Sequence, residues 1–321
     1  MITSSSLRPL RVNSKREIAR DIHMFELCDP EGGPLPAFTA GAHLPVRVPS
    51  GAMRQYSLCN DPQQNSFYQL AVKRDAAGRG GSVSLVDEVA EGDLLMVGAP
   101  ENLFALSEKA RSFILVGGGI GITPMMAMVR QLQAEGLRPF KLYYFTRDPE
   151  GTAFLDDLRA PELAGQVIIH HDHGDPARSF DLWKIFEKVA TGTHVYCCGP
   201  KGLMDTVKDM TGHWPDNAIH FESFGADTRA HADDQAFDVQ LHRSGQCITV
   251  GARQSILDAL RGHGIHVPSS CESGTCGSCK VGLLEGQADH RDLVLLPEEK
   301  ASQVMVCVSR SQNGGCLVLD L

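Results

Sequence analysis

Three closely spaced cysteines constrain this chain more than any other feature. They stand in the segment CESGTCGSCK as Cys271, Cys276 and Cys279, and Cys307 follows in the run VMVCVSR. The spacing C-x4-C-x2-C with a distant fourth cysteine is the plant-type arrangement for a [2Fe–2S] cluster. Glycine and serine in the loop let backbone N–H groups turn toward the cluster sulfurs. The sequence therefore predicts a fold that brings these four thiolates to one centre.

A structural zinc site is the alternative for the same four cysteines. Zinc sites favour C-x2-C pairs, and only Cys276 and Cys279 form one, beside an x4 gap. We therefore favour the iron–sulfur interpretation. The scattered cysteines are expected to be buried small apolar residues: these are Cys28, Cys59, Cys247 and Cys316.

Length and charge narrow the class of protein. The chain has 321 residues and a net charge of −9, which indicates two or three domains and disfavours nucleic acid as a partner. The sequence has no apolar run of membrane-spanning length and no apolar segment typical of a signal peptide at its start, so we expect no membrane association and a cytoplasmic location. Clustered cysteines in a reducing compartment indicate metal or redox chemistry rather than disulfides.

Three regions of the chain have different patterns. Residues 1–106 alternate short β-like runs with glycine and proline turns, which predicts an antiparallel β-barrel or a sandwich. Residues 107–226 alternate strands with helices, which predicts a doubly wound α/β domain with a parallel sheet. Residues 227–236 are small and polar and indicate a linker. Residues 237–321 contain a hairpin pattern, a short helix and the cysteine loop.

A glycine-rich segment begins the second region. LVGGGIGITPM follows an apolar strand and leads into an amphipathic helix, a context that suits phosphate at a helix N-terminus. Gly117, Gly119 and Gly121 are spaced by two, so the strict G-x-G-x-x-G pattern is not met. On spacing alone, a tight strand-to-helix turn without a ligand stays open.

The order of four motifs adds a resemblance to a known family. RQYSL (54–58), GRGGS (78–82), GGGIGITPM (117–125) and YCCGP (196–200) follow one another. This order resembles the ferredoxin–NADP reductase superfamily, in which a flavin-binding barrel precedes a nicotinamide-binding domain. With the cysteine loop added, the chain resembles phthalate dioxygenase reductase and its relatives, the FMN-, NADH- and [2Fe–2S]-containing reductases of Rieske oxygenases. The resemblance implies an α+β, β-grasp ferredoxin domain over residues 237–321.

The resemblance implies a flavin site on the barrel. Arg54 would pair with the flavin phosphate through its planar fork. Tyr56 and Ser57 would contact the isoalloxazine ring, with Ser57 near N5, and Lys73 would lie along the ring edge. An ordinary strand with solvated charges is the alternative for these residues.

The start of a predicted helix would complete the phosphate site. Gly80, Gly81 and Ser82 would present backbone N–H groups to the phosphate. The resembling family uses FMN and not FAD, a distinction that the residues themselves do not make.

The resemblance also implies a nicotinamide site. Gly119 and Gly121 would approach the nucleotide, and Thr123 would cap the following helix and contact the cofactor. Asp148 follows the next predicted strand, where a carboxylate usually binds the adenosine ribose and rejects a 2′-phosphate. We therefore expect NADH rather than NADPH.

Three residues are implied to lie where nicotinamide and flavin meet. Cys198 would sit near nicotinamide C4, and Glu222 and Phe224 would close over the flavin. Together with Ser57, Cys198 and Glu222 are the predicted catalytic residues.

The resulting hypothesis is an electron relay. NADH delivers hydride to FMN, and single electrons pass through the [2Fe–2S] cluster to a Rieske-type oxygenase. We expect a monomer that docks transiently, with Glu272 contributing to an acidic docking face. The alternatives are a reductase for another acceptor, such as a diiron monooxygenase or a dehydratase, and an inactive carrier or zinc-stabilised interaction module.

Overall fold

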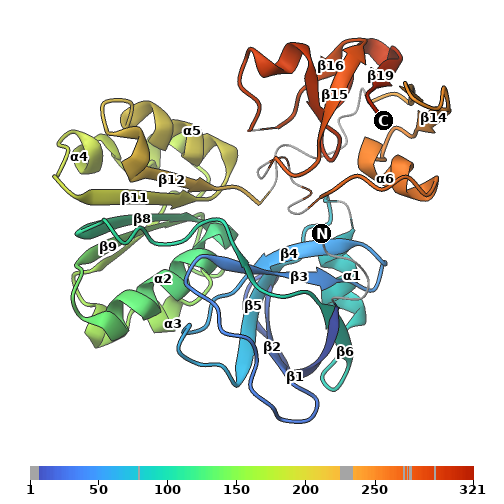
Figure 1. Ribbon diagram of the computed structural model, residues 1–321. Coiled ribbons are helices and arrows are strands. Elements are labelled where there is room, and N and C mark those ends of the chain that lie inside the picture. Colours follow the sequence, from blue (N-terminus) through green and yellow to red (C-terminus); the bar gives the residue numbers. More distant parts are fainter. Residues whose placement is uncertain are drawn as a thin grey trace. The chain divides into compact units, whose positions relative to one another are not determined.

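The computed structural model divides the chain into two compact units, Ser4–Ser223 and Phe224–Leu321, each of which is described by itself (Figure 1). Among the described residues, no helix combines the length and the apolar composition that crossing a bilayer requires. The structure describes residues 7–78, 80–224, 234–269, 272, 274, 277–292 and 294–321.

An antiparallel sheet forms the first part of Ser4–Ser223. Its strand order is β4-β3-β6-β1-β2-β5, and β7 pairs with β3. A bridge between Leu58 and Leu70 joins the end of β4 to β5, and this contact closes the sheet into a barrel, as predicted. The strands are β1 (Arg8–Ala19), β2 (Ile22–Cys28), β3 (Ala42–Arg47), β4 (Met53–Ser57), β5 (Phe67–Lys73), β6 (Leu94–Val97) and β7 (Glu101–Asn102).

Apolar side chains at alternate positions of the strands fill the core of the barrel. Phe25 and Leu27 of β2 are fully buried and pack in one apolar cluster with Leu70 of β5. The helix α1 (Gly81–Glu88) adds Leu85 to this cluster. Successive strand residues point to opposite faces, so every second apolar residue reaches the core.

A parallel sheet forms the second part of the unit. Its order is β10-β9-β8-β11-β12, and all neighbouring strands are parallel. Helices cover both faces (Figure 1), which confirms the predicted doubly wound fold. The strand order reverses between β8 and β11, where ligands of such sheets bind. The strands are β8 (Ser112–Gly118), β9 (Phe140–Thr146), β10 (Val167–His171), β11 (Thr193–Cys198) and β12 (Ile219–Glu222), and the helices are α2 (Ile122–Glu135), α3 (Leu155–Leu158), α4 (Trp183–Phe186) and α5 (Lys201–Met210).

The barrel and the parallel sheet share an apolar core. One buried cluster contains Met24 and Phe104 from the first part and Phe113, Met125 and Met126 from the second. Because such a shared core resists separation of its two halves, the carboxyl ends of β8 and β11 are held in place relative to the barrel.

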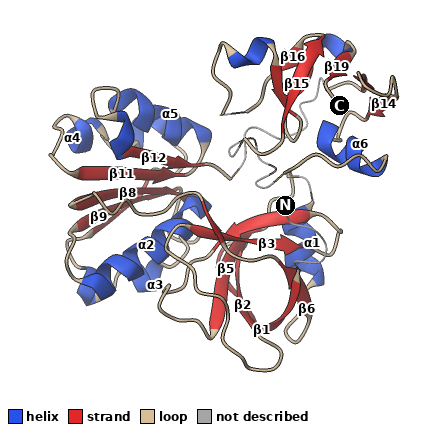
Figure 2. Cartoon of the chain, viewed as in Figure 1, coloured by secondary structure: helices blue, strands red, loops and turns tan. Residues whose placement is uncertain are grey.

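The unit Phe224–Leu321 is an α+β domain with one mixed sheet. Its strand order is β14-β13-β19-β15-β17, and β16 pairs with β18. Helix α6 (Ile256–Gly262) packs its apolar residues into the same core (Figure 2). The strands are β13 (Phe237–Leu241), β14 (Cys247–Val250), β15 (Lys280–Glu285), β16 (Ala288–Asp289), β17 (Gln303–Met305), β18 (Arg310–Ser311) and β19 (Leu317–Leu319).

Three of the four scattered cysteines are not buried. Cys59 is buried, as predicted, but Cys247 and Cys316 are exposed, and Cys28 is partly exposed. The prediction of burial is wrong for Cys247 because it occupies an outward position of β14, where exposed and buried residues alternate. A small side chain does not by itself place a residue inside.

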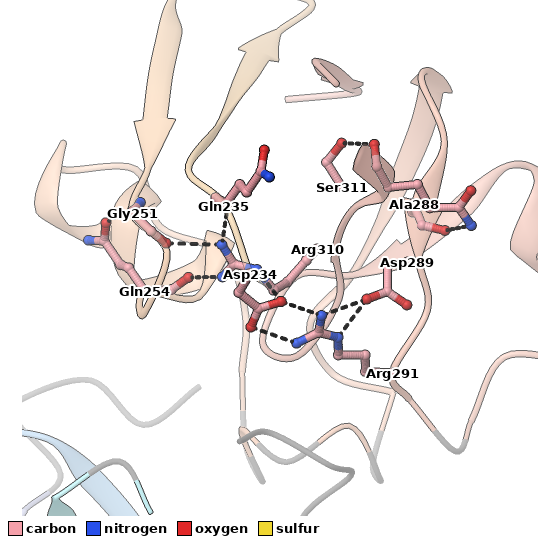
Figure 3. Close-up of polar contacts among 10 residues, drawn as sticks. Asp234, Gln235, Gly251, Gln254, Ala288, Asp289, Arg291, Arg310 and Ser311 are labelled. Atoms are coloured by element: carbon pink, nitrogen blue, oxygen red, sulfur yellow. Dashed lines mark hydrogen bonds and ion pairs between the residues drawn. The ribbon is translucent and has the colours of Figure 1, made fainter. Parts of the chain in front are cut away.

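A buried ionic network ties the beginning of this unit to its later strands (Figure 3). Arg291 donates to both carboxylate oxygens of Asp234, at 3.1 and 2.6 Å, and to Asp289 at 2.7 Å. Arg310 is buried and lies 3.5 Å from the Asp234 carboxylate. Its guanidinium also donates to the backbone carbonyls of Gln254, Gln235 and Gly251. Since Asp234, Arg291 and Arg310 are largely buried, removing any one of them would take a partner from a buried charge, which is strongly destabilising.

Candidate functional site

The glycine turn packs directly onto the end of β11. A 3-10 turn, Gly119–Gly121, connects β8 to α2. A Cβ atom at Gly121 would lie 2.2 Å from the Cys198 carbonyl oxygen, closer than any side chain tolerates. Gly119 has a φ of +53°, and a Cβ there would meet open space. The glycines of this turn therefore serve two purposes. Gly121 allows close packing against β11, and Gly119 allows a left-handed backbone conformation.

Thr123 does not cap α2, so that part of the prediction is wrong. The N-cap residue is Gly121, which has no side chain to cap with, because the 3-10 turn continues directly into the helix. The buried Thr123 hydroxyl donates to the Ile120 carbonyl at 3.0 Å. The first N–H groups of α2 have no side-chain cap, as expected at a site for an anionic ligand.

A pair of glycine variants tests the packing argument. We expect Gly121→Ala to destabilise this unit by about 2–3 kcal/mol because its Cβ must push β11 away. Gly202→Ala is the matched control, because Gly202 lies in α5 and a Cβ added there would have no atom within 4 Å. Since alanine favours helices, this control should gain roughly 0.5–1 kcal/mol. Urea unfolding of both variants measures the difference, and equal stabilities would contradict the close contact.

The three predicted catalytic residues lie together. Cys198 and Glu222 are register partners on β11 and β12. The Ser57 hydroxyl, from the barrel, donates to Glu222 Oε2 at 3.4 Å. The structure therefore brings residues 165 positions apart to the carboxyl end of the parallel sheet, at the point where its strand order reverses.

The two adjacent cysteines of β11 face opposite ways. Cys197 packs with Phe186 in the cluster on one face of the sheet, whereas Cys198 belongs to the cluster shared with the barrel. Burial and the nearby Glu222 carboxyl both raise the pKa of the Cys198 thiol well above its ordinary value. Cys198 is therefore a neutral thiol at physiological pH, not a thiolate.

Burial also determines the protonation state of Glu222. It raises the pKa of this carboxyl to about 8, although the hydrogen bond from Ser57 acts in the opposite direction. Glu222 is therefore mainly protonated at pH 7. A neutral carboxylic acid can both donate and accept a hydrogen bond.

The raised pKa predicts a pH dependence of stability. Glu222 binds its proton more tightly in the folded protein, so stability is complete below about pH 4.5, the ordinary pKa, and falls as pH rises toward 8. Between pH 6 and 8.5 we expect wild type to lose about 2 kcal/mol more than Glu222→Gln does. Thermal unfolding at both pH values measures this, with the exposed Glu162→Gln as control. Parallel pH profiles for wild type and Glu222→Gln would contradict the shift.

Arg54 and the start of α1 converge. A Cβ atom at Gly81 would lie 2.7 Å from Arg54 Nε, so the arginine side chain lies against the first turn of the helix. Gly80 is the N-cap, with a φ of 79° and no side-chain cap. The Ser82 hydroxyl accepts from the Asp75 backbone N–H at 3.1 Å. A guanidinium beside helix N–H groups suits a phosphate.

Tyr56 and Lys73 have contrasting environments. Tyr56 is partly buried and packs on the barrel core, and burial raises the pKa of its hydroxyl above the ordinary value. Lys73 is exposed at the end of β5. Phe224 is also exposed, with 44% of its surface accessible, and its proposed closure over the flavin stays a prediction.

Asp148 has a partner that the sequence did not indicate. Its carboxylate accepts from the Gly151 N–H at 2.8 Å and from Arg20 Nη2 at 2.6 Å. The Arg20 backbone N–H also donates to the Glu150 carbonyl at 2.8 Å. Hydrogen bonding by Arg20 lowers the pKa of Asp148, so the carboxylate is ionised. Arg20 lies between two barrel strands, and no local pattern connects it with position 148.

The two described cysteines of the cluster motif are buried together. Cys279 and Cys307 are 1% and 2% exposed, and the Val306 N–H donates to the Cys279 carbonyl at 3.3 Å. Gly274 and Gly277 have φ angles of 73° and 79°, a conformation that glycine adopts readily. This thiol pair fits an iron–sulfur cluster. Cys271 and Cys276 lie outside the described residues.

Glu272 does not belong to an acidic docking face, so that prediction is wrong. Only 7% of its surface is exposed, and its carboxylate accepts from Arg261 Nη2 at 2.6 Å. The residue has a left-handed backbone, with a φ of 50°, and its buried carboxylate is paired with Arg261.

Three family models match the three parts of the chain. The oxidoreductase FAD-binding domain matches residues 9–105, the oxidoreductase NAD-binding domain residues 115–209, and the 2Fe-2S iron-sulfur cluster binding domain residues 239–312. Fold, site and models together define an oxidoreductase with flavin, NAD and [2Fe–2S] domains. The chain belongs to the phthalate dioxygenase reductase family.

The relatives are similar over nearly their whole length. Phthalate dioxygenase reductase of Burkholderia cepacia is 59% identical over 97% of both chains. The phthalate 4,5-dioxygenase oxygenase reductase subunit of Pseudomonas putida is 57% identical over 97% of this chain and 96% of its own. A solved structure of phthalate dioxygenase reductase superimposes with a TM-score of 0.91, at 58% identity and 99% coverage of both chains.

Proposed function

We propose that this protein is the reductase component of a Rieske-type oxygenase system. The observation that carries the proposal is the convergence of Ser57, Cys198 and Glu222 at the reversal point of the parallel sheet. Similar chains named as reductases of phthalate dioxygenase systems support it. When bound, FMN accepts hydride from NADH and releases single electrons, which a [2Fe–2S] cluster transfers one at a time.

The residues around this point provide an uncharged environment. The hydrogen bond to Glu222 holds the Ser57 hydroxyl in place. Cys198 offers an uncharged thiol, and Glu222 holds a proton at neutral pH. No fixed charge therefore arises from these three residues where the nicotinamide and the flavin would meet, so the nicotinamide is oriented by contacts rather than by ion pairing.

We assign the flavin as FMN. Arg54, Gly80, Gly81 and Ser82 would enclose a terminal phosphate between the guanidinium and the start of α1. Tyr56 and Lys73 would line the ring. Acid release of the flavin followed by chromatography distinguishes FMN from FAD.

We assign Cys271, Cys276, Cys279 and Cys307 as the cluster ligands. Plant-type clusters have potentials near −400 mV, and Rieske clusters lie at about −150 to +300 mV. Transfer to a Rieske acceptor is therefore downhill. We further propose a monomer that docks transiently on its oxygenase.

Nucleotide preference tests the role of Asp148. We expect Asp148→Ala to raise the ratio of NADPH to NADH use by about 10-fold, because it removes a repulsive carboxylate and frees Arg20 for a 2′-phosphate. Steady-state reduction of ferricyanide with each nucleotide measures the ratio. Glu150→Ala, two positions further along the chain, is the control, and an unchanged ratio would show that Asp148 does not contact the ribose.

The visible spectrum before and after anaerobic NADH tests the whole proposal. We expect flavin and iron–sulfur bands that bleach with NADH and much less with NADPH. Electron delivery to a purified Rieske oxygenase, compared with a diiron monooxygenase component, then identifies the acceptor. A colourless protein, or one that NADH does not bleach, would support the carrier or zinc-stabilised alternative.

A further inference from the structure

Helix α6 contacts both separated parts of the cluster-binding region. The Leu257 N–H, in its first turn, donates to the Val306 carbonyl at 2.9 Å, and residue 306 precedes Cys307. Arg261, in its last turn, donates to Glu272 at 2.6 Å, and residue 272 follows Cys271. One helix therefore supports the residues next to two of the assigned ligands.

The helix is a firm support. The Ser255 hydroxyl caps it by accepting from the Asp258 N–H at 3.0 Å and donates to the Asp258 carboxylate at 2.7 Å. Ile256, Leu257 and Leu260 are no more than 1% exposed. Capping and burial together prevent fraying of so short a helix.

The contact from Arg261 spans the position of Cys271. Arg261 Nη2 donates to the Ser269 hydroxyl at 2.5 Å as well as to Glu272, and Ser269 itself donates to Glu272 at 3.3 Å. Glu272 has a left-handed backbone that costs energy for a residue other than glycine. Loss of Arg261 would remove the cation that is paired with this buried carboxylate, and removing one partner of a buried ion pair is strongly destabilising.

We propose that Arg261 is a positioning residue for the iron–sulfur loop. Its hydrogen bonds to Ser269 and Glu272 connect α6 to residues that precede and follow Cys271 in the sequence. Outer-shell contacts of this kind tune metal affinity and potential. The inference rests on the proposed function, since it requires that the loop holds a [2Fe–2S] cluster.

The test compares Arg261→Ala with Arg261→Lys and with Arg253→Ala in the full-length protein. Arg253 is an exposed arginine of the same domain. We measure the rate of cluster release to a chelator by visible absorption, and the EPR spectrum of the reduced cluster. Arg261→Ala should release the cluster about 10-fold faster and alter the EPR line shape. Arg261→Lys should restore most of the retention, and NADH should still bleach the flavin in every variant.

A double variant tests whether Arg261 and Glu272 act together as an ion pair or contribute to cluster retention independently. Arg261→Ala combined with Glu272→Gln should release the cluster no faster than Arg261→Ala alone, because the two residues act as one unit. Release rates and EPR spectra of Arg261→Ala equal to those of Arg253→Ala would overturn the inference. If Arg261→Ala does not fold, wild-type behaviour of both Arg261→Lys and Glu272→Gln would overturn it. A wild-type protein without a cluster would instead refute the proposed function.

Discussion

Cys279→Ala should abolish the iron–sulfur absorption of this protein while NADH still bleaches its flavin. Cys279 is buried beside the segment that contains Cys307, and alanine would remove one of the four proposed thiolate ligands. Electron delivery to a Rieske oxygenase should fall at least about 100-fold, beyond the range typical of losing an outer-shell contact.

The selectivity of this effect is as informative as its size. The cluster domain and the flavin and nucleotide domains belong to separate compact units, so hydride transfer from NADH to the flavin should continue at its normal rate. Iron analysis measures the iron content, visible spectra measure the iron–sulfur absorption, and stopped-flow bleaching measures the rate of hydride transfer to the flavin. Cys316→Ala, which replaces an exposed cysteine of the same domain, is the control. Full iron content in Cys279→Ala would exclude Cys279 as a ligand.

Arg54→Ala should weaken flavin binding by about 10- to 100-fold. A charge-assisted hydrogen bond contributes about 1.5–3 kcal/mol, and each 1.4 kcal/mol corresponds to a factor of 10 in affinity. Arg54 lies against Gly81 at the uncapped start of α1, so the substitution removes the guanidinium from the point where the helix N–H groups converge. Arg54→Lys should bind better than Arg54→Ala but worse than wild type, because lysine lacks the planar fork.

Fluorescence titration of the deflavinated protein measures this affinity. Arg16→Ala, which removes an exposed arginine from β1 of the same barrel, is the control and should bind flavin normally. Unchanged affinity in Arg54→Ala would move the phosphate site away from α1. Loss of affinity in both variants would indicate a general effect of charge.

Local patterns in the sequence were sufficient for the architecture. Strand alternation with glycine turns predicted a barrel or a sandwich, and alternating strands and helices predicted the parallel sheet. Both depend on short-range rules, since side-chain period and turn residues act over a few positions. The cluster motif was equally local, because three of its four cysteines lie within one loop.

Those short-range rules could not predict contacts between residues that are far apart in the sequence. The pairing of Asp148 with Arg20 joins residues 128 positions apart. Neither residue belongs to a sequence motif from which its partner could be predicted. Thr123 was expected to cap α2 from its residue type, but the 3-10 turn moved the cap to Gly121. Glu272 was expected to contribute to an acidic docking face, but it is buried and paired with Arg261.

The sequence by itself determined the three kinds of domain, their order and the residue types available for flavin, nucleotide and cluster. Only the tertiary structure decided which of these residues meet and in what protonation state. Glu222 shows the reason: its residue type gives an ordinary acid, whereas burial between β11 and the barrel raises its pKa to about 8. Burial depends on all the elements that pack around a group, so no short stretch of sequence contains it.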